Sequence, residues 1–73
     1  MSDYTDKTAN ELADMALAEA IASGEDKIVD QINELLGTSS QSLAEAYSTA
    51  IRVRRAKKRA RAMLAASVTA RKA

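Results

Sequence analysis

The chain has no cysteine and no histidine, and it also lacks proline, tryptophan and phenylalanine. Without cysteine, neither a disulfide nor a thiolate metal site can form. Without histidine, the commonest metal ligand and the usual general base at neutral pH are missing. There is no glycine-rich phosphate loop, and the serines have no histidine to activate them as nucleophiles. We therefore predict a protein that is not an enzyme, with no catalytic or metal-binding residues and no cofactor.

Long hydrophobic runs are absent as well. No stretch of about 18 apolar residues is available to span a membrane, and residues 1–10 are polar and acidic, unlike a secretory signal. We expect a protein of the cytoplasm, or one that is assembled from the cytoplasm into a larger particle.

The hydrophobic residues make up 47% of the 73 residues, but many of them are alanine, and the only aromatic residues are Tyr4 and Tyr47. Each small side chain buries little area, at roughly 25 cal/mol per Å². A single core in a chain of this length is marginal unless its helices pack closely or a partner covers it. We therefore expect a homo-oligomer or a complex with other protein subunits.

The net charge of +1 hides a strong asymmetry along the chain. Residues 1–45 contain all ten acidic residues and two lysines, which gives 2 − 10 = −8. Residues 46–73 contain nine basic residues and no acidic one, which gives +9. The sequence therefore predicts two segments of opposite charge.

The spacing of the apolar residues predicts an all-α fold, an antiparallel helical hairpin within one small domain, 1–73. A polar lead-in, 1–7, precedes an acidic segment, 8–36, whose helix covers about 9–36. Ser23-Gly24 leaves two alternatives, because glycine disfavours a helix interior while the apolar rhythm continues through it. A kink or short break there is slightly favoured over a continuous helix.

Gly37 has the position expected just past a helix end, and the serine-rich residues 37–41 predict the turn of the hairpin. The basic segment, 42–73, then forms a long helix over about 42–70, because neither proline nor glycine interrupts it. Apolar residues at steps of three and four give it a short coiled-coil-like seam. The residues that we predict to pack between the helices are Leu12, Leu17, Ile21, Ile28, Ile32, Leu35, Leu43, Tyr47, Val53 and Leu64.

In such a hairpin, position i lies near position 78 − i, which brings Asp26 opposite Arg52 and Glu19 opposite Arg59. The acidic segment would then cover the basic one. Exposed ion pairs contribute only about 0–1 kcal/mol each, so we expect them to fix orientation more than stability.

The densest charge lies in residues 52–61, which carry seven positive charges and no negative one. The candidate interaction residues are Arg52, Arg54, Arg55, Lys57, Lys58, Arg59 and Arg61. In composition, this run resembles the arginine-rich motifs of helical RNA-binding peptides and basic nuclear-import signals, which implies contacts with phosphates. Three alternatives remain open for the run: neutralisation by acidic residues of this or a neighbouring chain, binding to DNA or RNA, and binding to an anionic membrane surface.

Two functional hypotheses follow. The first is a structural or assembly subunit that oligomerises through helical seams and oppositely charged segments, as in a virion or a secretion-type complex. Its two-helix layout is similar to that of secretion-needle subunits, although the proline turn of that family is missing. The alternative is a small regulator or packaging protein that binds DNA or RNA through residues 52–61. An adaptor helix for an acidic protein is a third, weaker hypothesis.

Overall fold

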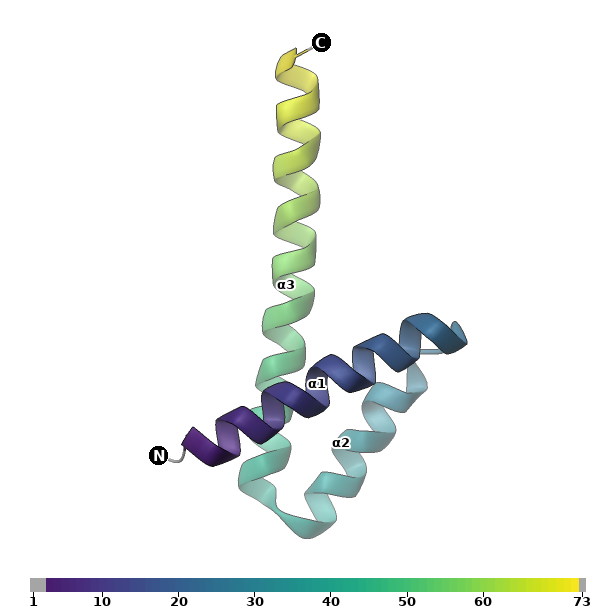
Figure 1. The fold of residues 1–73 in the computed structure, drawn as a ribbon, viewed down its shortest axis with the longest axis vertical. Coiled ribbons are helices and arrows are strands. Elements are labelled where there is room, and N and C mark those ends of the chain that lie inside the picture. Colours follow the sequence, from purple (N-terminus) through teal and green to yellow (C-terminus); the bar gives the residue numbers. More distant parts are fainter. Residues whose placement is uncertain (1–2, 73) are drawn as a thin grey trace.

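The computed structural model describes residues 3–72, which form three helices and no strand. Helix α1 spans Asp3–Ser23, α2 spans Lys27–Ser39 and α3 spans Gln41–Lys72 (Figure 1). The all-α prediction is confirmed. The two-helix hairpin is not confirmed, because the acidic segment forms two helices instead of one.

The division between α1 and α2 is made by Gly24, whose φ of +78° is left-handed. Glycine adopts this conformation without the steric penalty of a β carbon. Its N–H donates to the carbonyl of Ala20 at 2.9 Å, and the N–H of Glu25 donates to Ser23 Oγ at 3.2 Å. The break, and not the continuous helix, is therefore the correct alternative at this point.

The second reversal of the chain is made by Ser40 alone, so the predicted turn over 37–41 is shorter than expected. Helix α2 continues through Gly37 to Ser39, and Ser40 is extended, with φ −155° and ψ 108°. The Ser40 N–H donates to the carbonyl of Leu36 at 2.7 Å, and Ser40 Oγ accepts the N–H of Leu43 at 3.2 Å. One residue thus closes α2 and caps α3, which leaves Gly37 in ordinary helical conformation.

The core is built mainly from alanine. Ala9, Ala13, Ala16 and Ala20 recur at steps of four and three along one face of α1, and all four are buried. Such small side chains allow helix axes to approach closely. Against this face pack three larger buried side chains, Val29, Tyr47 and Ile51, together with Ala50. The hydroxyl of Tyr47 donates to the carbonyl of Val29 at 2.8 Å and so joins α3 to α2.

Burial corrects part of the predicted helix-packing set. Tyr47 is buried, and Leu12, Leu17, Ile28, Ile32 and Leu43 are partly buried around the core. Four others are instead exposed on the surface of the chain: Ile21 (79%), Leu35 (62%), Val53 (57%) and Leu64 (66%). Ile21 is exposed because the alanine face of α1, and not its larger side chains, is turned toward α3. Leu35 and Val53 lie on sides of their helices that are turned away from the core, and Leu64 lies in the C-terminal half of α3, which no other helix covers.

The resulting molecule is flat and extended, with Cα extents of 51 × 31 × 13 Å. Its radius of gyration is 15.0 Å, against about 11 Å for a compact domain of this length. Figure 1 shows the cause. Helix α1 lies across the N-terminal half of α3, and α2 runs from the end of α1 back to the start of α3, so the C-terminal half of α3 projects alone.

The two glycines predict opposite responses to the same substitution. Gly24→Ala should destabilise the fold by about 1 kcal/mol, because alanine is strained at a positive φ. Gly37→Ala should stabilise it by about 0.5–1 kcal/mol, since Gly37 is helical and an added β carbon meets nothing within 4 Å. Urea unfolding of both variants checks the signs; equal shifts in one direction would contradict the break at Gly24.

Candidate nucleic-acid interface

The C-terminal half of α3 does not contribute to the core. Residues 56–72, which we call the arm, are exposed along their whole length. The rest of the molecule, α1, α2 and residues 41–55 of α3, is called the body. The arm is helical because it is rich in alanine, arginine and lysine, all strong helix formers, and has no glycine or proline.

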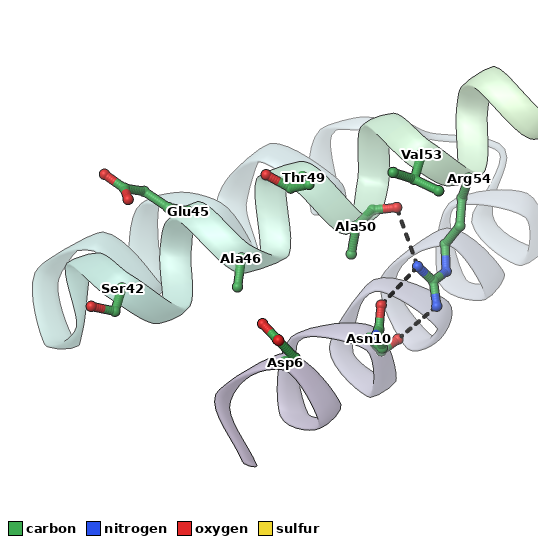
Figure 2. A pocket seen from close by; sticks show the side chains of 9 residues that line it. All are labelled: Asp6, Asn10, Ser42, Glu45, Ala46, Thr49, Ala50, Val53 and Arg54. Carbon is green, nitrogen blue, oxygen red and sulfur yellow. Dashed lines mark hydrogen bonds between the residues drawn. The ribbon is translucent and has the colours of Figure 1, made fainter. Parts of the chain in front are cut away.

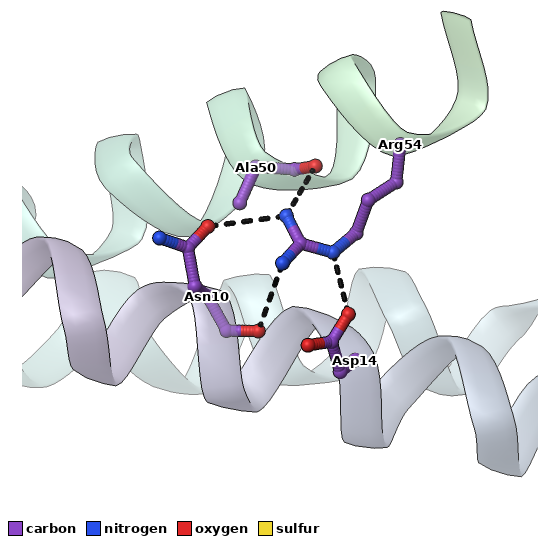
Figure 3. Close-up of polar contacts among 4 residues, drawn as sticks. All are labelled: Asn10, Asp14, Ala50 and Arg54. Carbon is purple, nitrogen blue, oxygen red and sulfur yellow. Dashed lines mark hydrogen bonds and ion pairs between the residues drawn. The ribbon is translucent and has the colours of Figure 1, made fainter. Parts of the chain in front are cut away.

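One member of the basic run, Arg54, joins α3 to α1 within the body. Its Nε donates to Asp14 Oδ1 at 2.6 Å, and its Nη1 donates to Asn10 Oδ1 at 3.1 Å (Figure 3). The same guanidinium also donates to the carbonyls of Ala50 and Asn10, at 3.2 and 3.4 Å. Arg54 is therefore half-buried and structural, since it fixes where α1 crosses α3.

The hydrogen bond from Arg54 lowers the pKa of Asp14 below its ordinary value of 3.8, and the positive charge of the guanidinium acts in the same direction. Because the folded state favours the ionised carboxylate, this pair stabilises the fold above about pH 3.8. Its contribution is lost as the pH falls below that value, through the lower pKa of the folded state.

A second basic residue, Arg55, approaches the acidic turn between α1 and α2. Its Nη2 lies 3.6 Å from Asp26 Oδ2, and both side chains are largely exposed. Together with the Tyr47–Val29 hydrogen bond, this contact shows that α2 and α3 run in opposite directions from Ser40. The expected pairing of Asp26 with Arg52 is not found, because Asp26 lies beside Arg55 instead.

The remaining five candidates are exposed, and none of their side chains has a hydrogen bond or ion pair with another described residue. They are Arg52, Lys57, Lys58, Arg59 and Arg61. Within residues 3–72 the expected cover by the acidic segment is thus limited to Arg54 and Arg55, and Glu19 does not pair with Arg59. The physical reason is the break at Gly24, after which the acidic turn reaches only the start of the arm, where Asp26 and Lys58 line the same pocket.

The bases are not evenly distributed around the helix, which turns by 100° per residue. Arg52 and Arg59 share one side of α3, and Lys58 and Arg61 lie on another side. Between these rows runs an uncharged face that contains Val53, Ala56 and Ala60. The arm therefore presents separate charged and uncharged faces to the solvent.

Within the body, a pocket of about 500 Å³ lies between the N-terminal half of α1 and residues 42–54 of α3 (Figure 2). Small side chains such as Ala46, Thr49 and Ala50 line it along α3, and Asp6 and Glu45 place carboxylates in its lining. Arg54 closes one end. The pocket is thus negatively charged near the start of α3.

Other chemistry is limited in the part of the chain that the structure describes. Residues 3–72 contain no group of three or more histidine, cysteine, aspartate or glutamate side chains that could hold a metal ion. None of their helices is both long and apolar enough to cross a membrane. What the surface offers is a concentration of positive charge on a rigid helix.

No protein-family model, curated protein or solved structure matches this chain. Its function therefore has to be inferred from its own residues. Sequence reasoning found the basic run but missed the contacts of Asn10 and Asp14 with Arg54. No signal in the sequence distinguished Arg54 from its six basic neighbours, because only the crossing point of α1 selects it.

Loss of the Arg54 guanidinium should release Asp14. We expect NMR titration to give Asp14 a pKa below 3.8 in the unmodified protein and a pKa near 3.8 in Arg54→Gln. Urea unfolding of this variant should also show a weaker loss of stability on acidification. Arg55→Gln removes the same charge one residue away and is the control; an equal effect on Asp14 would contradict the specific role of Arg54.

Proposed function

We propose that this protein binds double-helical nucleic acid through the arm and the adjoining basic residues of α3. The observation that carries the proposal is that five of the seven basic residues in 52–61 are exposed and have no carboxylate partner among the described residues. Phosphate groups would neutralise them, and the release of condensed counterions would favour binding.

The flat body supports this role because it keeps the acidic residues away from the phosphates. Residues 56–72 extend about 25 Å at 1.5 Å per residue. Most of the arm is therefore farther from the body than the Debye length, which is about 8–10 Å at moderate ionic strength and beyond which exposed charges are largely screened. The charge of −8 in residues 1–45 therefore does not prevent the arm from approaching a polyanion.

The side chains of the arm favour a duplex over a single strand. The arm has no aromatic residue on which an unpaired base could stack. Its arginines and lysines suit contacts with phosphate oxygens, which position a protein without reading sequence. We therefore infer binding that depends strongly on salt and only weakly on base sequence, as a packaging protein or a small regulator requires.

A second candidate function is that of a structural or assembly subunit in a larger particle. The observation that favours it is the separation of charge, with acidic residues on the body and unpaired basic residues on the arm. Opposite charges on two parts of one molecule attract a neighbouring copy. This role and nucleic-acid binding are compatible, because different faces of α3 can serve them.

Lys58→Gln/Arg61→Gln should weaken binding to duplex DNA or RNA of any sequence. We expect the slope of log K against log salt to become shallower by about 1 to 2, since each phosphate contact contributes about 0.9. Fluorescence anisotropy at several salt concentrations measures this slope.

The matched control is Lys7→Gln/Lys27→Gln, which removes the same charge from α1 and α2. It should leave the slope unchanged if the arm is the binding surface. Equal losses in both double variants would show that only the net charge matters, and no retention of duplex at low salt would refute the proposal.

A further inference from the structure

The side of α3 turned away from α2 carries a continuous uncharged face. From Ser42 to Ala70, uncharged residues recur at alternating steps of four and three, a heptad pattern. In the basic run, the only three residues without charge, Val53, Ala56 and Ala60, all fall on this face. Met63, 76% exposed, continues it along the arm. Leu43 and Ala50 do not belong to this face, because they pack toward the body.

Apart from Ala46, which is partly buried against the core, the residues of the uncharged face are exposed. The face leads into the pocket between α1 and α3. Ser42, Ala46, Thr49 and Val53 belong both to this face and to the lining of the pocket. Figure 2 shows Asp6 of α1 facing the same stretch of α3. The pocket is therefore a groove with a floor of small side chains and with carboxylates from Asp6 and Glu45.

We propose that a second copy of this chain occupies the groove, with the two α3 helices antiparallel, so that each copy places the start of its arm in the groove of the other. The arm offers small residues, Ala56 and Ala60, flanked by Lys57 and Arg59. The groove offers a matching floor with acidic flanks. This pairing rests on the assembly role proposed above and gives it a specific contact. It does not depend on nucleic-acid binding.

Charge complementarity selects the register of the pair. If Ala56 lies opposite Ala46 of the second copy, paired core positions sum to 46 + 56 = 102. Glu45 then lies beside Arg59 of the second copy, on one flank of the core. On the other flank, Lys57 of the second copy approaches Asp6. Lys57 and Arg59, two of the three bases at the edge of the uncharged face, therefore each meet a carboxylate, and two-fold symmetry repeats each contact.

A parallel pair and an antiparallel pair in a shifted register both bring further like charges together. A parallel pair brings Arg52 close to Lys57 of the second copy, so like charges meet at its flanks. An antiparallel pair shifted by one heptad, to a sum of 109, brings Arg52 close to Arg59. In the proposed register, the remaining like-charge contact joins the two Arg52 side chains near the two-fold axis. The rows that contain Lys58 and Arg61 stay outside the interface.

Cysteine pairing tests the orientation directly, because the chain has no cysteine of its own. Ala46→Cys and Ala56→Cys chains are mixed in equal amounts, without nucleic acid, and oxidised gently. The antiparallel pair predicts that the mixed 46–56 disulfide is the main dimer on a mass spectrum. Predominant 46–46 and 56–56 disulfides would show a parallel pair and overturn the proposal, as would the absence of any disulfide.

Two arginine substitutions with the same change of charge should act in opposite directions. Arg59→Gln removes the partner of Glu45 and should raise the dimer Kd by roughly tenfold, whereas Arg52→Gln removes repulsion at the axis and should lower it several-fold. Sedimentation equilibrium at two salt concentrations measures both. Equal shifts in one direction, or a monomer at every concentration, would overturn the pairing. A monomer that still retained duplex would leave nucleic-acid binding intact.

Discussion

The left-handed residue Gly24 is the constraint on which the rest of the structure depends. It folds the acidic segment into two helices of 21 and 13 residues, whereas α3 has 32 residues. At 1.5 Å per residue, α2 covers about 20 Å of a helix that is about 48 Å long, and α1 crosses that helix instead of following it. The arm is exposed because of this mismatch in length, so its charge has to be satisfied from outside the chain.

The sequence predicts the parts of this fold that depend on backbone preference. Glycine and serine indicate where the chain reverses, and the absence of helix breakers after Gly37 predicts the long final helix. Packing is harder to predict. Hydrophobicity alone places Ile21 and Leu35 in the core, whereas the close approach of the helix axes requires alanine there. In α1, the alanine steps and the leucine and isoleucine steps have the same helical period. Only the position of α3 shows which of these two faces is buried.

The basic run illustrates the same limit at the candidate site. Its seven basic residues are alike in sequence, yet they differ in the structure. Arg54 is half-buried and bonded to α1, Arg55 forms an ion pair with Asp26, and the other five are exposed without a partner among the described residues. That division depends on where α1 crosses α3, at Asn10 and Asp14, and no local pattern contains this information. The concentration of positive charge was predictable, whereas its accessibility depends on tertiary structure.

The two proposed uses of α3 reinforce each other physically. Pairing of two copies would bring Lys57 and Arg59 to the acidic groove of the second copy, which lowers the negative potential around the body. The row with Lys58 and Arg61, which stays outside the interface, would then contact phosphates with less repulsion from nearby carboxylates. Two arms that point in opposite directions could also contact one duplex at two places, where the second contact benefits from a high effective concentration. Linkage requires the converse: a duplex that binds both arms at once must tighten the pair, because it favours the state with two arms.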